Sequence, residues 1–410
     1  MRSSSLTSID ADQHFDKFVR NAIFKPLLLM KIVLLTTDNR EHYKTYSGPV
    51  PLFGTAPEAL LQGFASIPES EVHVISCTRQ PVPAPEKLAG NIYFHSLLVP
   101  RIGWIRTGFQ GCIRASRKKI REIQPQIVHG QGTESDCSIS AVFSGFPNVL
   151  TIHGNMRLIA KVNQAQAFSY PWLAARLERF TIPRSQGVVC ITRYTKEAVA
   201  GIARRTWVVP NAVDQAFFQI NAQPQTAIPR ILCVGHVCHR KNQNAFIRSL
   251  DALSKKRQFE LLFLGAANPG DLYADEFRQL VAARPWCRYL GVSNRDQLRG
   301  HFQQASLLAL PSLEDNCPMV VLEAMAAQVP VLAANVGGVP DLVEPGKTGF
   351  LCDPVNPQSM MEATENALLN LPFARELARQ ANSSALERFH PRVVANRHLE
   401  IYREVLSSPS

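Results

Sequence analysis

The sequence lacks the cysteine patterns that identify disulfide-rich domains and structural metal sites. Its nine cysteines, at positions 77, 112, 137, 190, 233, 238, 287, 317 and 352, include no C-x-x-C pair. A zinc site or a disulfide framework needs tighter spacing than this. Most of the cysteines stand in apolar runs such as Val188–Cys190, which is typical of small buried side chains in a reducing compartment. We therefore expect a cytoplasmic protein without a metal site.

The sequence also has no long apolar run. A helix that spans a bilayer needs roughly 20 apolar residues, whereas the longest run here, residues 26–35, is interrupted by Lys31. Residues 1–20 are polar and partly acidic, which does not match a signal peptide. We interpret residues 1–29 as an N-terminal extension, either a genuine segment or the result of an upstream start codon. No G-x-G-x-x-G motif follows a strand, which argues against a dinucleotide-dependent oxidoreductase.

The composition is that of an ordinary globular protein, but the charge is uneven. Of the 410 residues, 46% are hydrophobic and 19% are charged, which excludes disordered, collagen-like and coiled-coil proteins. The length favours two domains. Residues 1–222 carry 25 Lys and Arg against 15 Asp and Glu, so this half holds +10 of the net charge of +11. A basic half favours an anionic partner: nucleic acid, an acidic membrane surface or a phosphorylated substrate.

Short apolar segments alternate with helical patterns along the whole chain. The predicted strands are 31–35, 71–75, 126–129, 148–153, 187–191 and 206–209, and then 230–234, 260–264, 288–290, 306–310, 330–333 and 349–351. Such alternation is typical of parallel sheets covered on both faces by helices. The sequence therefore predicts an α/β protein with two Rossmann-like, doubly wound domains, residues 30–215 and 216–390, that face a central cleft. A C-terminal helix in residues 391–410 is expected to return to the first domain.

A loop between a predicted strand and a predicted helix carries the most informative residues. The segment Pro-Ser-Leu-Glu-Asp-Asn-Cys-Pro, residues 311–318, leads into a helix that contains Glu323. In open α/β sheets, ligands bind beyond the carboxyl ends of the strands. Backbone N–H groups at a helix N-terminus suit a diphosphate, and carboxylates at Asp315 and Glu323 can hold sugar and ribose hydroxyls.

These residues resemble the signature of glycosyltransferase family 4, which comprises retaining enzymes of the GT-B fold. That signature is Pro-Ser-x-x-Glu, a short loop, and a second Glu eight residues after the first, followed by Ala-Met-Ala. Glu323 and residues 324–326 match, whereas Asp315 stands where the family usually has Glu, directly after Glu314. The resemblance implies that Asp315 or Glu314 holds the donor sugar and that Glu323 holds the ribose. The same loop contributes Asn316, Cys317 and Pro318 to the predicted sugar and ribose site.

A second segment resembles the donor phosphate site of the family. Val-Gly-His-Val-Cys-His-Arg-Lys-Asn, residues 234–242, follows the first strand of the second domain. Lys241 matches the family lysine that pairs with the donor diphosphate. His236 replaces the usual arginine, and Arg240 is expected to compensate for its charge. The resemblance further implies that the nucleotide base is held largely through backbone and that no metal or other cofactor is needed beyond the nucleotide-diphosphate sugar itself.

Two further segments, one in each half of the chain, resemble the family as well. Val-Gly-Gly-Val-Pro-Asp, residues 336–341, matches a Gly-Gly-x-Pro-Glu segment of the family, and Gly337 and Gly338 are expected to let the backbone approach a ligand closely. Pro-Asn-Ala-Val-Asp, residues 210–214, matches the segment that links the two domains, and we interpret it as structural.

The first domain is expected to face the acceptor. His153, at the end of a predicted strand, stands where the family has a His that contacts the donor sugar. His129 lies in Val-His-Gly-Gln-Gly, which resembles a Val-His-x-His segment of the family, and is placed at the acceptor cleft together with Gly48 and Gly54 of the loop after the first strand. For both histidines, a purely structural role is the alternative.

A basic stripe is predicted on one helix of the first half. Arg114, Arg117, Lys118 and Arg121 recur at spacings that place them on one helical face, and Lys119 adds a fifth charge. Basic side chains with aromatic residues nearby suit an anionic membrane surface, and the alternative is a solvated helix face. No recognition motif accompanies the charge, so nucleic acid is not expected as a partner.

These patterns predict a hexosyltransferase that moves a sugar from a nucleotide-diphosphate sugar to an acceptor hydroxyl with retention of anomeric configuration. The expected pathway is the synthesis of a cell-surface glycan or glycolipid, with a carbohydrate, a lipid-linked compound or another hydroxyl compound as acceptor. His153 and Asp315 are expected to orient the sugar. The expected location is the cytoplasm, with peripheral binding at the inner face of the membrane. A nucleotide-sugar 2-epimerase of the same fold and a non-catalytic nucleotide-sugar-binding protein are the alternatives.

Overall fold

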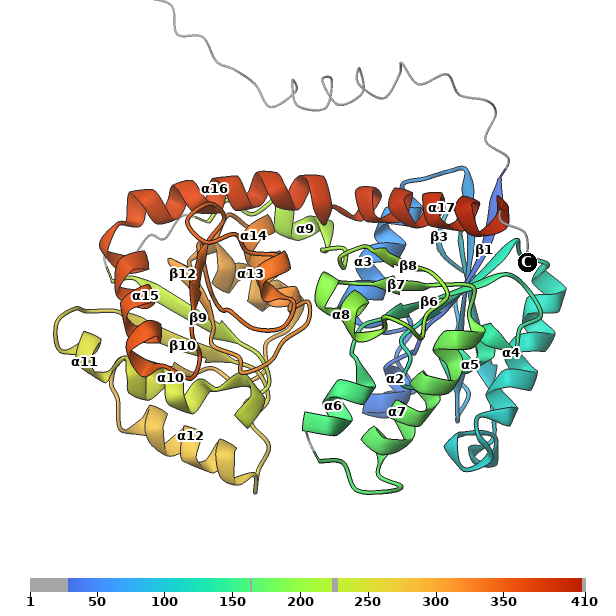
Figure 1. Ribbon diagram of the computed structural model, residues 1–410, viewed down its shortest axis with the longest axis horizontal. Helices are drawn as coiled ribbons and strands as arrows, with labels where there is room; N and C mark the ends of the chain where they lie inside the picture. The colour runs from blue at the N-terminus through green and yellow to red at the C-terminus, as the bar shows by residue number, and fades with distance from the viewer. Residues whose placement is uncertain (1–28, 163, 223–227, 408–410) are drawn as a thin grey trace, which may run out of the picture.

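The computed structural model describes residues 29–162, 164–222 and 228–407. Two α/β domains lie side by side, and two long helices, α16 (Leu371–Arg388) and α17 (Pro391–Ser407), run along one side of both (Figure 1). The predicted extension lies outside the described residues apart from Leu29. The predicted two-sheet α/β architecture is confirmed.

The first sheet has eight strands in the order β3-β4-β2-β1-β5-β6-β7-β8. They are β1 (Met30–Leu35), β2 (Ser70–Thr78), β3 (Lys87–Ala89), β4 (Ile92–Leu98), β5 (Ile127–Gln131), β6 (Asn148–Ile152), β7 (Val188–Cys190) and β8 (Thr206–Val208). All neighbours are parallel except β3 and β4. Strands β3 and β4, at the end of the sheet, were not predicted from the sequence, and polar residues interrupt the apolar pattern of β4, Ile-Tyr-Phe-His-Ser-Leu-Leu.

The second sheet has six strands in the order β11-β10-β9-β12-β13-β14, all parallel. They are β9 (Arg230–Val234), β10 (Glu260–Leu264), β11 (Cys287–Tyr289), β12 (Leu307–Leu310), β13 (Val331–Ala334) and β14 (Phe350–Cys352). Each corresponds to a predicted strand within two residues. Strand β9 lies between β10 and β12, so the loops after β9 and β12 meet at one edge of the sheet.

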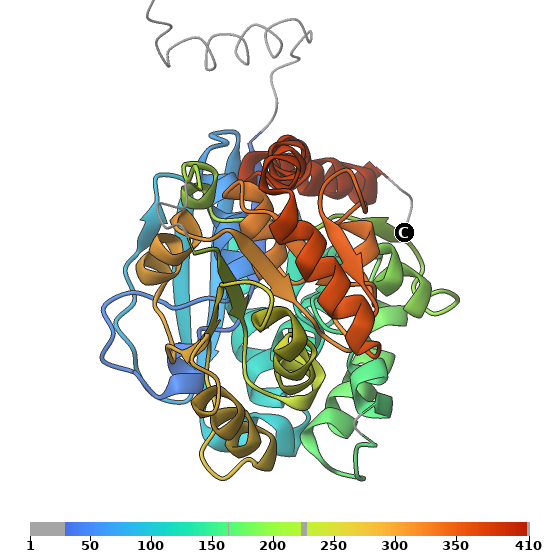
Figure 2. The ribbon, with the colours of Figure 1, turned by 90° about the vertical axis from the view of Figure 1, so that its left-hand side faces the viewer.

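Apolar side chains of the second sheet alternate between two cores. Leu232, Leu262 and Leu308 face helices α14 (Met319–Ala326) and α16, whereas Ile231 and Leu261 face the opposite layer. That layer consists of α10 (Gln243–Ser249), α12 (Leu272–Ala282) and α15 (Pro357–Leu369), and Figure 2 shows yellow-green α10 and orange-red α15 in front of the sheet. Both faces of the strands are therefore buried, which explains their near-continuous apolar sequence.

The first sheet is covered in the same way. The helices on or beside it are α2 (Arg40–Tyr43), α3 (Thr55–Ala65), α4 (Gln110–Ile123), α5 (Asp136–Val142), α6 (Met156–Val162), α7 (Tyr170–Thr181) and α8 (Arg193–Ala198). Helix α17 packs on α3, and Phe64 shares a buried cluster with Val394 and Tyr402. A Cβ on Gly63 would lie 2.1 Å from the backbone oxygen of Pro391, so glycine is required where the two helices meet. The C-terminal helix thus contacts the first domain directly.

The short elements complete the chain. They are η1 (Arg101–Gly103), η2 (Ile105–Thr107), η3 (Ile182–Arg184), α9 (Gln215–Phe218), η4 (His239–Lys241), α11 (Asp251–Ser254), α13 (Arg295–Gln303) and η5 (Val339–Asp341). Within residues 29–162, 164–222 and 228–407, no helix combines the length and the apolar character that crossing a bilayer requires.

Candidate functional site

The loops after β9 and β12 bring a lysine and an aspartate together. Lys241 Nζ lies 2.6 Å from Asp315 Oδ2, and Ser312 Oγ donates a hydrogen bond of 3.1 Å to the same carboxylate oxygen. The side chains of Lys241 and Asp315 are 14% and 11% exposed, so water screens this pair only partly. The backbone N–H of Leu313 donates to the carbonyl of Arg240, which ties the two loops together. The predicted phosphate residue and the predicted sugar residue therefore lie in direct contact.

Arg240 lies over the same loop from the solvent side. Its Nη1 donates to the backbone carbonyl of Glu314 at 2.8 Å and lies 3.6 Å from the Glu314 carboxylate and 3.7 Å from that of Asp315. Burial raises the pKa of Glu314, and the nearby Arg240 opposes this shift. Of the two adjacent acids, Asp315 thus makes the close contact with Lys241, and Glu314 contacts Arg240.

Glu323 lies within α14, the helix that follows this loop, and its carboxylate already has a cationic partner. Its Oε1 lies 2.6 Å from Arg295 Nη1, and the Glu323 side chain is only 4% exposed. Burial raises the pKa of the Glu323 carboxyl, whereas Arg295 counteracts this effect. Arg295 also reaches Asp214 at 3.4 Å and stacks over the ring of Phe217 at 4.8 Å. Sequence reasoning missed Arg295, and its only signal was a basic residue at the start of the helix after β11.

The amide of Asn316 joins the two domains. Its Oδ1 accepts hydrogen bonds from Thr192 Oγ1 at 2.5 Å and Thr195 Oγ1 at 2.8 Å, and its Nδ2 donates to the backbone carbonyl of His153 at 3.3 Å. All three partners belong to the first domain. The structure thus gives this predicted sugar-site residue an interdomain contact.

The last two predicted residues of the loop, Cys317 and Pro318, contribute to packing and to the start of α14. Cys317 is buried, and burial raises the pKa of its thiol to about 12. Pro318 directly precedes α14 at its N-cap position. Neither side chain offers a charged group to a ligand.

Two glycines that were expected to approach a ligand lie close to the backbone of a neighbouring loop. A Cβ on Gly337, whose φ is +54°, would lie 2.0 Å from the carbonyl oxygen of Asp315. A Cβ on Gly338 would lie 2.1 Å from the carbonyl oxygen of Asn316. Glycines at these positions therefore allow the loop after β13 to pack against the loop after β12, and their contact with a ligand stays a prediction.

His153 lies at the end of a hydrogen-bonded path through the first domain. His153 Nε2 is 2.8 Å from Gln131 Oε1, and Gln131 Nε2 is 3.2 Å from His129 Nε2. His129 Nδ1 in turn lies 2.5 Å from the hydroxyl of Tyr402 on α17. Burial lowers the pKa of His153 to about 4, so its ring is neutral near pH 7. The path connects His153 with the C-terminal helix.

The placement of His129 at the acceptor cleft is corrected by its burial. The side chain is 0% exposed, and its Nε2 also contacts Thr151 Oγ1 at 2.7 Å. Desolvation lowers the pKa of the His129 imidazole well below its ordinary value, with His398 as a second cause. A residue with no exposed surface and with partners on both nitrogens cannot contact an acceptor, so His129 has the structural role that was the alternative.

The two predicted acceptor glycines lie in the loop after β1. The carbonyl of Gly48 accepts a hydrogen bond of 2.6 Å from Nη1 of Arg40. Arg40 is itself buried and pairs with Asp38 at 2.7 Å. Gly54 occupies the N-cap of α3. This buried ion pair holds the loop against the end of the sheet.

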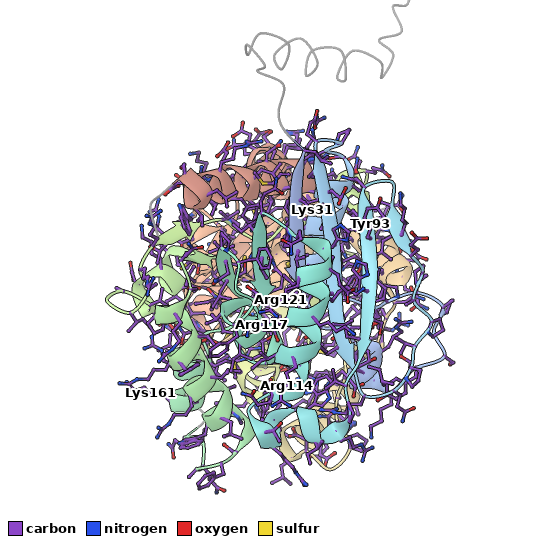
Figure 3. All side chains as sticks on the ribbon, turned by 90° about the vertical axis from the view of Figure 1, so that its right-hand side faces the viewer. Lys31, Tyr93, Arg114, Arg117, Arg121 and Lys161 are labelled. Carbon is purple, nitrogen blue, oxygen red and sulfur yellow. The ribbon has the colours of Figure 1, made fainter. Side chains whose placement is uncertain are left out.

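The predicted basic stripe lies on α4. Arg114, Arg117 and Arg121 follow one another along the outer face of this helix (Figure 3), and Lys118 is exposed as well. Lys119 differs, because it is half-buried and pairs with Glu122 at 2.6 Å. Four of the five predicted charges thus face solvent on one side of the first domain.

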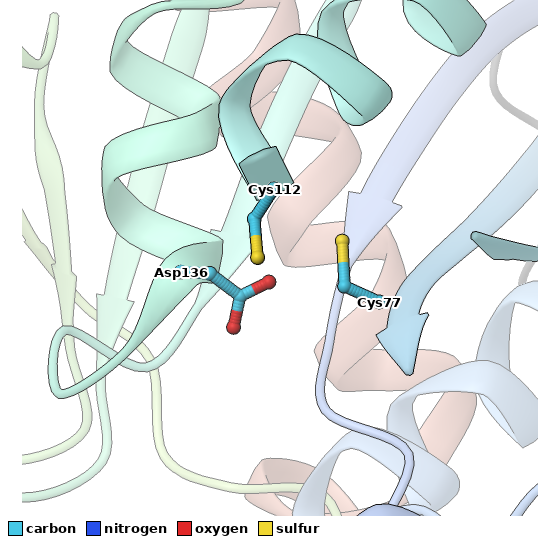
Figure 4. A group of neighbouring side chains, drawn as sticks. All are labelled: Cys77, Cys112 and Asp136. Carbon is cyan, nitrogen blue, oxygen red and sulfur yellow. The ribbon is translucent and has the colours of Figure 1, made fainter. Parts of the chain in front are cut away.

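Three buried side chains of types that can ligate a metal also lie close together. Cys77 of β2, Cys112 of α4 and Asp136 of α5 have ligand atoms that all lie within 4.8 Å of one another (Figure 4). The hydrogen bond with the Cys112 thiol, followed by burial, raises the pKa of Cys77 well above its ordinary value, and burial raises that of Asp136. The groups therefore favour their protonated forms, and three ligands are fewer than the four of a structural zinc site. All nine cysteines are free thiols.

The chain matches two family models. The model described as Glycosyl transferases group 1 matches residues 228–370, and the model described as Glycosyltransferase Family 4 matches residues 60–217. Among curated relatives, D-inositol 3-phosphate glycosyltransferase from Paenarthrobacter aurescens is 28% identical over 43% of this chain and 44% of its own length. Across the first four such relatives the aligned part covers 44–62% of their length, so the chain spans about half of the relatives it matches.

Solved structures resemble nearly the whole chain. Sucrose-phosphate synthase from Thermosynechococcus elongatus is similar with a TM-score of 0.74 and 16% identity, over 93% of this chain and 100% of that one. HepE from Anabaena, in complex with UDP and glucose, is similar with a TM-score of 0.68 and 17% identity, over 92% of this chain and 100% of that one. The chain therefore belongs to the family 4, group 1 glycosyltransferases and has the GT-B fold.

Proposed function

We propose that the protein transfers a hexose from a nucleotide-diphosphate sugar to an acceptor hydroxyl with retention of anomeric configuration. The observation that carries this proposal is the contact of Lys241 with Asp315 at the carboxyl ends of β9 and β12. Family membership supports the reaction class. The HepE structure with UDP makes UDP-sugars the first donors to test.

The positive charges of the site suit a nucleoside diphosphate as leaving group. Lys241 and Arg240 are cations beside Asp315 in the loop that leads into α14, and together they would stabilise the negative charge that grows on the phosphate as the glycosidic bond breaks. Asp315 neutralises Lys241 in the free protein and would turn to the sugar hydroxyls when the diphosphate takes its place. We propose that these two cations supply the charge that a metal supplies elsewhere, so that no metal is required.

The first domain would contribute His153 to the donor sugar. Asn316 joins the signature loop to the backbone carbonyl of His153, which places the two near each other. Because its pKa is about 4, His153 would act as a neutral hydrogen-bonding group. We assign no side chain as nucleophile: attack on the same face, assisted by the leaving phosphate, accounts for retention.

We place the reaction in the synthesis of a cell-surface glycan or glycolipid at the cytoplasmic side of a membrane. Four exposed cations on α4 support a peripheral contact with anionic lipid.

A screen with nucleotide sugars tests the reaction. Thermal stabilisation of the protein should identify the donor, and labelled donor with a membrane extract should give a labelled product of retained configuration. If a donor binds but neither transfer nor slow donor hydrolysis is detected, the enzyme assignment is contradicted. Epimerised donor in the absence of acceptor would instead identify a nucleotide-sugar 2-epimerase.

A further inference from the structure

A basic pocket opens beyond the carboxyl ends of three neighbouring strands of the first sheet. Its volume is about 900 Å³. It is lined by Glu41, Lys44, Tyr46, Arg79, Arg101, Ile102, Trp104, Ile105, Arg106 and Thr107. These residues follow β1, β2 and β4, which are parallel neighbours. We call this site the basic pocket.

The cations of the basic pocket outnumber its acids. Glu41 is the single acid among four cations, and it is already paired with Arg79 at 2.7 Å. Lys44, Arg101 and Arg106 are exposed, and within the described part of the chain their side chains have no hydrogen-bond or ion-pair partner. Three unpaired positive charges around one hollow repel each other, so an anion bound among them lowers the free energy of the pocket.

The walls of the basic pocket are held in place by buried contacts. The guanidinium of Arg79 stacks over the ring of Trp104 at 4.3 Å, and the indole N–H of Trp104 donates to the carbonyl of Val99 at 3.0 Å. Tyr46 donates its hydroxyl hydrogen to Glu41 at 3.2 Å. Arg79, Trp104 and Tyr46 are therefore held in place before any ligand arrives, which reduces the entropy cost of ordering this part of the wall on binding.

The position of the basic pocket relates it to the transfer site. Strands β4, β2, β1, β5 and β6 are consecutive neighbours in the sheet, and His153 follows β6. The basic pocket and His153 consequently occupy the same edge of the first sheet. The pocket is distinct from the stripe on α4, whose exposed cations do not line it.

We propose that the basic pocket binds a phosphate or diphosphate ester carried by the acceptor. This inference rests on the proposed function, because it assigns the acceptor of that reaction to an anionic class. Arg101 and Arg106 would hold the phosphate by charge-assisted hydrogen bonds. Exposed Ile102 and Ile105 would contact the apolar part of the acceptor.

The test uses glycerol 3-phosphate as a soluble probe and vesicles of phosphatidylglycerol in phosphatidylcholine as a lipid probe. The pocket variant is Arg101→Ala/Arg106→Ala in the full chain. The matched control is Lys255→Ala/Lys256→Ala, which removes the same charge from an exposed turn of the second domain. The pocket variant should bind at least one probe about tenfold or more weakly than the wild type, whereas the control should not.

The two probes separate the sources of the phosphate. Loss of glycerol 3-phosphate binding alone identifies a soluble phosphate ester, and loss of vesicle binding that glycerol 3-phosphate also competes away identifies a lipid headgroup. Equal affinities of the pocket variant and the control for both probes would overturn the proposal, as would wild-type protein that binds neither.

A Lys241→Met variant shows whether glycerol 3-phosphate binds in the basic pocket or in the donor site. If that substitution alone abolished glycerol 3-phosphate binding, the probe would occupy the donor site and the basic-pocket proposal would be wrong. If no nucleotide sugar stabilised the wild-type protein, the proposed function would fail, while the result for the pocket variant would still decide whether the pocket binds phosphate.

Discussion

Replacing Lys241 with methionine removes one positive charge and keeps most of the side-chain volume. The leaving phosphate gains about one negative charge as the glycosidic bond breaks. At about 4 Å and an effective dielectric constant of about 20, one lysine stabilises that charge by about 4 kcal/mol. Arg240 lies 3.7 Å from Asp315 in the same site and compensates in part. We therefore expect kcat to fall about 100-fold, within the roughly 1000-fold that 4 kcal/mol allows.

The substitution also affects the folded protein without donor. Asp315 would lose its 2.6 Å partner and keep Ser312 as a hydrogen-bond donor. Breaking a mostly buried pair costs about 3 kcal/mol of stability. A Lys241→Met/Asp315→Asn double variant removes both charges and should recover much of that stability without recovering kcat. Because Asp315→Asn also removes the proposed sugar ligand, the double variant reports on stability alone. The kcat of Lys241→Met, measured well below its unfolding temperature, reports on the catalytic contribution of Lys241.

The assay is the initial rate of labelled sugar transfer, or of slow donor hydrolysis, at saturating donor. Thermal unfolding of the same samples measures stability. Lys255→Met is the matched control, because Lys255 is exposed on the second domain far along the chain from the signature loop. A kcat for Lys241→Met within about threefold of the wild type would refute the phosphate role.

Three further predictions concern the donor site, the buried histidines and the basic stripe. Glu323→Gln should weaken binding of nucleotides but not of free sugar; unchanged nucleotide affinity in calorimetry would count against a ribose contact. Burial lowers the pKa of His153 and of His398 to about 4. Both rings are neutral in the folded state while the unfolded chain takes up protons below about pH 6.5. Stability should therefore be full above pH 6.5 and fall towards pH 4 in urea titrations, and His398→Gln should flatten this fall; an unchanged slope would contradict it. Arg117→Ala/Lys118→Ala should reduce sedimentation with anionic liposomes, and intact binding would show that the stripe is only a solvated face.

The sequence alone predicted the elements whose signal is local. Twelve segments were recognised as strands because short apolar runs alternate with helical patterns, and the loops after β9 and β12 were recognised because Lys241 and Asp315 lie within short family motifs. The two strands that were missed, β3 and β4, lie at an edge where polar residues are tolerated.

Contacts between distant segments were decided only by the tertiary structure. Arg295 became the partner of Glu323 because α13 and α14 pack against one sheet, and no local pattern encodes that pairing. His129 is buried and not at the predicted cleft, and its Nδ1 contacts the hydroxyl of Tyr402, which lies 273 residues further along the chain.

What the sequence determined by itself was the family, the two-sheet fold and the excess of positive charge in the first half, because composition and short motifs are properties of neighbouring residues. The tertiary structure decided where that charge gathers. Lys44, Arg79, Arg101 and Arg106 come from three separate loops and meet only because β1, β2 and β4 end at one edge of the same sheet.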